Sequence, residues 1–345
     1  MTPSFRRIAY LGLLGLALCA AVPFYLAGQQ PDSEAVRKLE SQVAANPDDV
    51  GARTQLLEEH YFLRADRSRK ATAARQQHIL WLIRNRPDAP VLDTPYAHLD
   101  AILESSAYAE GKQAWMEQVD RDPTNATILG HAASYLLLHD SAAAEDLYKR
   151  AEAAEPQNPK WTRQLGQLYS LGLSGKADEG RQQAAKDALV AYERSLPNMK
   201  EAEEREAMLP DVAKAALEAG DLAKARGYAE EILKQAGSSG RDNWNYGNMI
   251  HHGHLLLGRL ALLDGDVATA KEHLLAAGKT PGSPQLNSFG PNMLLARELL
   301  EKGEQQAVLD YFKLCGSFWE RSELETWAKD VRAGKTPNFG ANLDY

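Results

Sequence analysis

The sequence predicts an all-α fold: a right-handed α-solenoid of helical hairpins, preceded by one N-terminal transmembrane or signal helix. Three observations support this fold class. The 345 residues include 53 Ala and 47 Leu but only 18 Val plus Ile. Ala and Leu cost least in a helix, whereas β-branched residues are typical of sheets. A register of small residues, glycines and acids recurs along the chain, and a stretch without charges lies near its start.

Residues 1–30 form the first segment, a cytoplasmic stub and a signal-anchor helix over about residues 8–27. Arg6 and Arg7 precede these twenty uncharged residues, which would span roughly 30 Å as a helix and so match a bilayer core. Positive charges before the stretch and none directly after it favour an N-terminus in the cytoplasm. We expect a single-pass protein of a bacterial cytoplasmic membrane with its body in the periplasm. The alternative is a signal peptide that is cleaved to leave a secreted protein.

The net charge bears on the class of partner, and the cysteine content bears on the compartment. The net charge is −8, which disfavours a general nucleic-acid binder. Cys19 lies within the apolar stretch, so the body holds one cysteine, Cys315, and cannot form an internal disulfide. A body without cysteine pairs is compatible with an oxidising compartment.

Four places share one register. A small residue is followed three positions on by an aromatic or apolar one, four further by Gly or His, then by an acid, and four later by Ala or Val. These places begin at Ala132, Ala213, Gly258 and Ala296, and their acids are Asp140, Asp221, Asp266 and Glu304. Small residues let two antiparallel helices approach, Gly ends the first helix, and the acid caps the second. The register therefore predicts helical hairpins, which must stack to bury both faces.

The remaining segments follow from spacing. Residues 31–124 are interpreted as degenerate hairpins, residues 125–200 as clear repeats, and residues 201–315 as repeats with extended loops. In the unit that starts at Trp161, we expect the second helix only at about Ala188, after a polar stretch over residues 174–183. Residues 316–345 should form a capping helix, with aromatic residues that cover the last unit, and a tail that packs back or hangs free.

The register resembles the tetratricopeptide repeat. Leu165-Gly166-x-x-Tyr169 matches the first-helix signature of that family, and Tyr135 to Tyr169 equals its usual period of 34 residues. The resemblance covers roughly residues 33–315. It implies a right-handed stack whose first helices line a concave groove that holds peptide ligands.

Three basic residues directly follow the small first-helix position: Lys214, Arg259 and Arg297. In the resembled family this position faces the groove, where cations hold ligand carboxylates. Alternatively, each cation pairs with a neighbouring acid such as Glu218 or Glu298 and does nothing more. The amides that accompany the cations in the family's carboxylate clamp are missing here. A strict specificity for C-terminal carboxylates is therefore not expected.

A histidine cluster supports a different class of function. We find no compact catalytic signature, but His251 and His254 share a helix face, and the paired helix carries His273. Three imidazoles would suit zinc or copper, which makes a metal-binding or enzymatic protein the alternative function. The competing interpretation is a polar loop that satisfies its own backbone.

Two polar loops, residues 241–252 and 281–292, form a second candidate patch. If they lie on one edge of the stack, they present a mixed aromatic and amide surface made of Trp244, Asn248, His252, Asn287 and Phe289. Such a surface could bind a small molecule. The alternative is a rigid connector in which Asn292 caps the next helix.

The function expected from these features is a non-enzymatic scaffold outside the cytoplasmic membrane that binds another protein or peptide and needs no cofactor. An envelope assembly factor that works as an oligomer is a related alternative.

Overall fold

The computed structural model describes residues 33–62, 69–173 and 178–343, and the regular structure of these residues is helical throughout. The all-α prediction is confirmed for this part of the chain. The apolar stretch over residues 8–27, on which the anchor prediction depends, lies outside the described residues. Among these residues no helix has both the length and the apolar character needed to cross a membrane.

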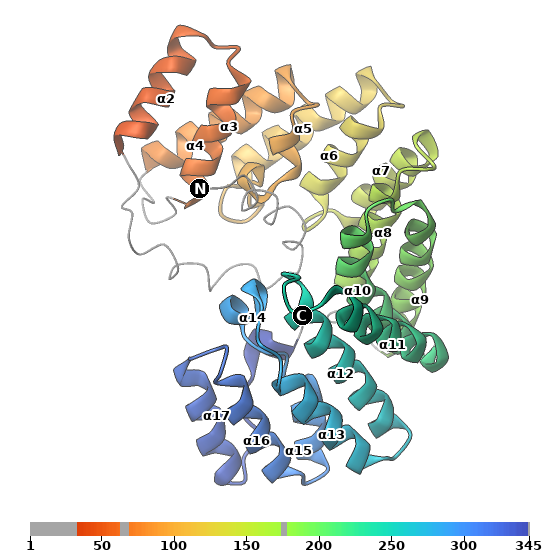
Figure 1. The fold of residues 1–345 in the computed structure, drawn as a ribbon. Helices are drawn as coiled ribbons and strands as arrows, with labels where there is room; N and C mark the ends of the chain where they lie inside the picture. Colours follow the sequence, from red (N-terminus) through yellow and green to blue (C-terminus); the bar gives the residue numbers. More distant parts are fainter. Residues whose placement is uncertain (1–32, 63–68, 174–177, 344–345) are drawn as a thin grey trace. The chain divides into compact units, whose positions relative to one another are not determined.

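The chain forms two compact units, and the division falls within α8 (Pro159–Leu171), at residue 168. The N-terminal unit begins with the hairpin of α2 (Ser33–Ala45) and α3 (Val50–Phe62). Next come α4 (Arg69–Asn85) and α5 (Ser105–Arg121), joined by the 3₁₀ turns η1 (Pro90–Asp93) and η2 (Pro95–Ala97). The hairpin of α6 (Ala126–Leu136) and α7 (Ser141–Ala154) leads to α8 (Figure 1).

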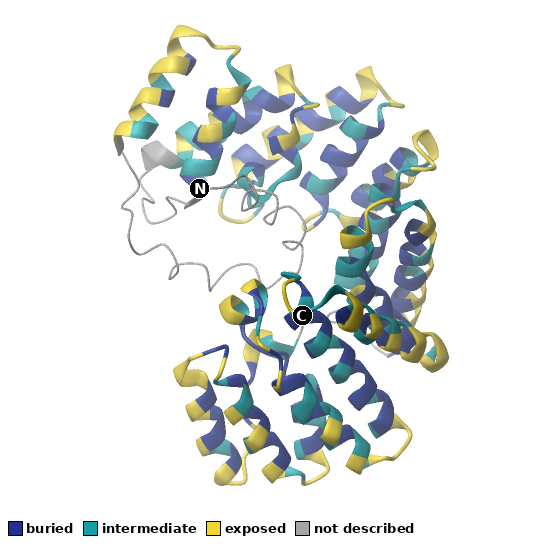
Figure 2. Cartoon of the chain, viewed as in Figure 1, coloured by how far each residue is buried: buried dark blue, intermediate teal, exposed yellow. Residues whose placement is uncertain are grey.

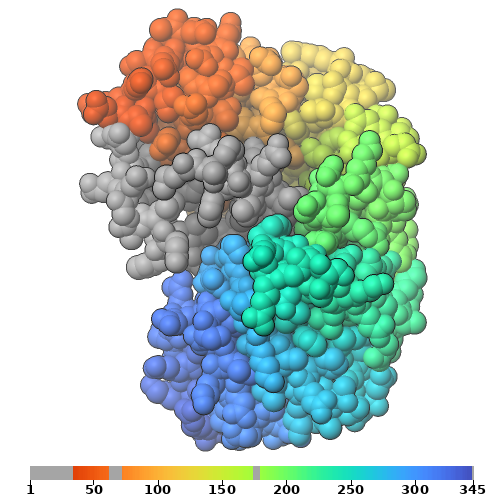
Figure 3. Space-filling model, in the orientation of Figure 1, coloured from red at the N-terminus to blue at the C-terminus, as the bar shows by residue number. Residues whose placement is uncertain are grey.

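The C-terminal unit contains α9 (Asp178–Ser195), a 3₁₀ turn η3 (Leu196–Asn198), and the hairpins α10–α11 (Ala202–Ala219, Leu222–Ser239) and α12–α13 (Tyr246–Leu263, Val267–Gly278). A short α14 (Pro284–Phe289) precedes the hairpin α15–α16 (Leu294–Glu301, Gln305–Cys315). The unit ends with α17 (Ser322–Arg332) and η4 (Gly340–Leu343). Helices that follow one another in sequence pack on each other from α10 to α13 and again from α15 to α17, whereas α14 packs on α12. Figure 3 shows these segments following one another along the C-terminal unit.

All four predicted hairpins are present, and they are built as the register implies. Gly220, Gly265 and Gly303 end their first helices with φ of 82°, 81° and 83°, a conformation that glycine adopts without steric cost. The contact positions are fully buried: Ala144, Ala213, Ala225, Ala270, Ala296 and Val308. Figure 2 shows the facing sides of the helices buried and the hairpin turns exposed.

The acid after the turn caps the second helix in three hairpins. The carboxylates of Asp140, Asp221 and Asp266 accept the amide three residues on, at 3.3, 3.1 and 3.0 Å. Among the described hairpins the fourth differs, because Glu304 caps nothing with its side chain and instead pairs with Lys271 at 2.8 Å. The longer glutamate reaches past its own helix start, so the predicted cap is wrong there.

Two expectations about loops need correction. The polar stretch before Ala188 is not all loop, since α9 already begins at Asp178; Ala188 and Tyr192 are nevertheless buried contact residues, as the spacing predicts. The polar loop 281–292 is not irregular throughout either. It contains α14, which Ser283 caps by accepting the amide of Leu286 at 3.0 Å.

The C-terminal tail packs back onto the last hairpins. Phe339 is 2% exposed and lies against Trp327 and Phe312, with ring centroids 5.1 and 6.1 Å away. Asn342 donates to the carbonyls of Phe289 and Pro291 at 3.1 and 2.9 Å. The predicted capping helix α17 and this tail therefore close the C-terminal unit together.

Candidate functional site

The three predicted cations occupy equivalent positions. Lys214 lies on α10, Arg259 on α12 and Arg297 on α15, and each is partly exposed next to a buried small residue. The register thus brings the cations to the first helices of three successive hairpins. It does not show, however, which carboxylates lie between them.

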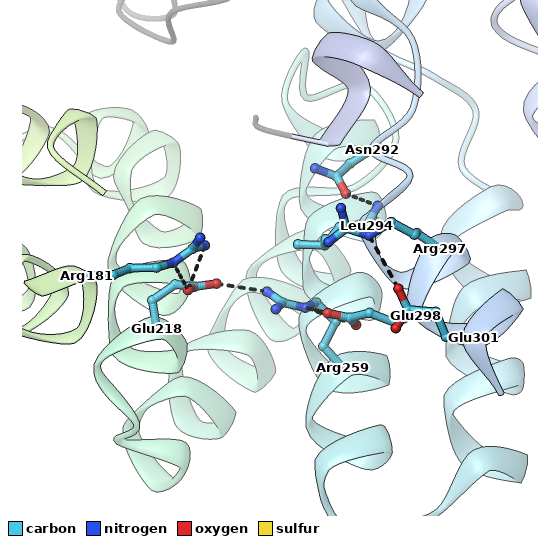
Figure 4. A network of polar contacts seen from close by, with 8 residues as sticks. All are labelled: Arg181, Glu218, Arg259, Asn292, Leu294, Arg297, Glu298 and Glu301. Carbon is cyan, nitrogen blue, oxygen red and sulfur yellow. Dashed lines mark hydrogen bonds and ion pairs between the residues drawn. The ribbon is translucent and has the colours of Figure 1, made fainter. Parts of the chain in front are cut away.

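The structure reveals a ladder of alternating charges across four helices (Figure 4). Arg181 of α9 donates to Glu218 of α10, with Nη2 and Oε2 3.0 Å apart. The other oxygen of Glu218 lies 3.4 Å from Nη1 of Arg259, whose Nε contacts Glu298 of α15 at 3.0 Å. We call Arg181, Glu218, Arg259 and Glu298 the charge ladder.

The charged groups of the charge ladder are partly buried. Side-chain exposures are 12% for Glu218 and 19% for Arg259, so both groups have lost much of their hydration. Burial raises the pKa of Glu298, and the adjacent Arg259 opposes this shift. The predicted row of cations is therefore interrupted by acids, and for Arg259 the ion-pair alternative describes what the structure shows.

Arg297 differs from Arg259. Its nearest carboxylate is that of Glu301, at 4.0 Å from Nε, which is too long for a hydrogen bond. Nε itself is buried and lacks a hydrogen-bond partner among the described residues. The Arg297 side chain is 39% exposed and its contact with Glu301 is long, so its guanidinium is available to donate to an external carboxylate.

Lys214, one of the predicted groove cations, lies near His252, a member of the predicted aromatic and amide patch. Burial, together with the positive charge of Lys214, lowers the pKa of His252 to about 4. His252 therefore stays neutral at ordinary pH, and Lys214 carries the charge at this end of the face.

The structure does not assemble the predicted three-histidine site. His254 and His273 do meet, with their Nδ1 atoms 3.0 Å apart, so that one ring donates to the other. His251 is fully buried and uses both nitrogens elsewhere: Nδ1 donates to the carbonyl of Ala277 at 3.2 Å, and Nε2 accepts the amide of Asn292 at 3.1 Å. Within the described parts of the chain, no group of three or more His, Cys, Asp or Glu could hold a metal ion.

The two polar loops do lie together, but their amides mainly bind each other. Asn248 is buried, accepts the hydroxyl of Ser283 at 2.6 Å, and donates to Asn245 at 2.9 Å and to Gln285. Asn292 caps α15 by accepting the amide of Leu294 at 2.9 Å. This is the rigid-connector alternative.

The other members of the predicted patch are more accessible. Asn287 is exposed, while Trp244, His252 and Phe289 are half-buried. Their role in binding a ligand stays a prediction.

Sequence reasoning missed Arg181, the first residue of the charge ladder. It lies in the polar stretch that was interpreted as a loop, and its partner Glu218 is 37 residues away. A helical periodicity extended back to Asp178 would have placed Arg181 on α9, but only the packed structure shows that it faces α10.

Comparisons with known proteins complete the description. No protein-family model matches this chain, and no curated protein matches it. Solved structures do match, among them one from a functional characterisation of PilF from Pseudomonas aeruginosa. That match has 14% sequence identity and a TM-score of 0.38, and covers 76% of this chain and 99% of the other. A likeness of this degree says nothing of what the chain binds.

Proposed function

We propose that this chain is a non-enzymatic scaffold that binds a protein or peptide through the first helices of its C-terminal hairpins. It is held on the outer side of the cytoplasmic membrane by residues 8–27. The observation that carries the binding proposal is Arg297, a cation 39% exposed whose contact with Glu301 is as long as 4.0 Å, on the same face as the charge ladder (Figure 4).

The charge ladder would prepare this face for a ligand. Glu218 and Glu298 hold the guanidinium of Arg259 from two sides, so its side chain is already ordered and little entropy is lost on binding. A ligand carboxylate that reaches the exposed guanidinium of Arg297 would gain a charge-assisted hydrogen bond. Alternating charges on the face also disfavour ligands whose own charges are in the wrong order.

The test is capture of a partner from envelope extracts by wild-type protein and by the variant Lys214→Ala, Arg259→Ala, Arg297→Ala. We expect the triple variant to lose the captured partner while its helix content stays the same. The matched control replaces three ion-paired cations of second helices, Lys224, Arg226 and Lys271, by Ala. Equal capture by the triple variant and wild type would refute the proposed binding face.

A further inference from the structure

Ile102 and Leu103 stand out from the N-terminal unit as adjacent aliphatic side chains in water. Their exposed fractions are 81% and 84%, the highest of the large hydrophobic residues that the structure describes. Leu138, 42% exposed, lies on the α6–α7 turn, which reaches the same place because the amide of Ala101 donates to His139 Nε2 at 3.4 Å. Contiguous exposed apolar side chains mark interaction sites, whereas scattered ones do not.

The turn that carries these side chains is braced. Oδ1 of Asp100 accepts the amides of Ile102 and Leu103 at 2.8 and 2.7 Å. The carboxylate of Glu104 accepts Arg75 at 3.1 Å and Gln76 at 3.0 Å, both from α4. A fixed backbone therefore holds the two aliphatic side chains outward. This lowers the entropy cost of burying them against another surface.

This turn lies at the edge where the chain enters the unit. The helices α2 and α3 are antiparallel around a turn at residues 46–49, so Ser33 and the end of α3 share one edge. Tyr61, near the end of α3, packs on Tyr96 of η2 with ring centroids 5.0 Å apart, and Ile102 follows six residues later. The start of α2 and the exposed aliphatic pair thus belong to the same edge.

Chain length sets the distance from this edge to the membrane. Five residues, 28–32, separate the apolar stretch from α2. At about 3.5 Å per residue they reach at most about 18 Å, so an anchored chain keeps this edge close to the bilayer. Two carboxylates at this edge are ion-paired, Glu104 with Arg75 and Asp140 with Lys112 at 2.7 Å, and a third, Asp100, is held by two backbone amides.

We infer that this edge of the N-terminal unit lies on the lipid bilayer, with Ile102, Leu103 and Leu138 in its interfacial region. The inference rests on the anchoring proposed above. Aliphatic side chains on a braced turn lose their contact with water there, at little ordering cost.

The test uses the full chain with Cys19→Ser, reconstituted in vesicles of equal parts phosphatidylcholine and phosphatidylglycerol. A nitroxide is attached at Leu103→Cys or, as control, at Ala45→Cys, an exposed site at the turn of the α2–α3 hairpin, away from this edge. Cys315 does not interfere because it is buried, and burial raises the pKa of its thiol. We expect the label at position 103 to collide with dissolved oxygen, and to be several-fold less accessible to a water-soluble nickel chelate than the control label.

Flotation of the same samples separates the possible failures. If the chain floats with the vesicles but position 103 is as accessible to the nickel chelate as position 45, the edge does not contact lipid. The inference is then overturned while the anchor stands. If the chain does not float, both proposals fall.

A second variant checks that the pair itself places the edge on lipid. Ile102→Ser with Leu103→Ser should make a label at Leu138→Cys several-fold more accessible to the nickel chelate, with unchanged helix content. An unchanged accessibility at position 138 would overturn the inference as well.

Discussion

His251 shows, at the scale of single residues, how a polar side chain can belong to a core. The ring lies in the C-terminal unit beside Tyr311, with ring centroids 6.4 Å apart, and each nitrogen bonds a backbone group. This double use fixes the neutral tautomer with its proton on Nδ1. The spacing of the histidines indicates a shared helix face, but no spacing reports that a ring nitrogen already has a partner in a distant loop.

The histidines of α12 and α13 should make the C-terminal unit acid-sensitive. Burial lowers the pKa of His251 to about 3 and of His252 and His254 to about 4, and it also lowers the pKa of His273. Below the unfolded value of 6.5 the unfolded chain therefore binds more protons, so stability is complete above that pH and is lost as pH falls towards 4. The urea midpoint should drop between about pH 7 and about pH 5.

The double variant His254→Asn, His273→Asn isolates part of this effect. Its urea midpoint should change less with pH over the same range, because two of the groups that resist protonation are gone. A pH dependence equal to that of wild type would contradict the assignment.

Gly247 tests the close contact between the two polar loops. A Cβ at this position would lie 1.8 Å from the carbonyl oxygen of Gly282, which is backbone and cannot rotate away. Gly247→Ala should therefore lower the free energy of unfolding by about 1–3 kcal/mol. Gly227, within α11, has open space around its Cα, and Gly227→Ala should instead raise it by about 1 kcal/mol. Urea unfolding of both variants decides, and a neutral Gly247→Ala would show that the loops do not touch.

Helix caps are the features at the scale of elements that sequence predicts best. Asp221 caps α11 through the amide of Lys224, whereas Glu304 at the matching position of α16 does not cap with its side chain. Asp221→Ala should therefore cost about 1 kcal/mol of unfolding free energy, and Glu304→Ala should cost less. Equal losses in urea unfolding would mean that the glutamate caps in solution too.

The C-terminal tail should contribute to stability because it fills the space beside α17. Trp327 donates its indole N–H to the carbonyl of Asn338 at 3.1 Å, and Phe339 is buried next to it. Phe339→Ala removes a buried aromatic ring and should cost about 3–5 kcal/mol. A weaker near-ultraviolet circular dichroism signal from the tryptophans should accompany the loss. A variant as stable as wild type would mean that the tail is detached in solution.

Local signals explain which elements the sequence could predict. The four hairpins of the register close within a few residues, so the residues that determine each turn, Gly or His followed by an acid, are adjacent in sequence. The pair α4–α5 is different, because residues 86–104 separate its helices and fold into η1 and η2 against other elements. Likewise α14 and the beginning of α9 lie in polar segments whose composition is typical of loops, although both are helical.

The charge ladder belongs to the scale of the whole C-terminal unit. One of its two cations, Arg259, could be predicted from the sequence, but its ion pairs could not. Its ion pairs join residues 37, 41 and 39 positions apart, and these distances close only when successive hairpins stack. Arg259 could be found because it follows a small contact residue, Gly258. Its acid partners Glu218 and Glu298 were candidates only as alternatives, and the other cation, Arg181, was missed.

Three features remain predictions: the membrane helix over residues 8–27, the right-handed course of the stack, and the boundaries of the repeat segments. The membrane anchor, the lipid-facing edge and the binding face are proposals about different parts of the molecule. The first two concern where the N-terminal unit lies, and the third concerns what the C-terminal unit holds.

Site-specific photo-crosslinking in native cells tests the central claim, that the first helices of the C-terminal hairpins bind a partner. A photoreactive residue replaces Glu301, which is exposed beside Arg297, or, as control, the exposed Glu272 of the second helix α13. We predict a discrete crosslinked product at position 301 that disappears in the Lys214→Ala, Arg259→Ala, Arg297→Ala background, and none at position 272. A product at position 301 that survives the triple substitution, or its absence in the wild type, would contradict the proposed function.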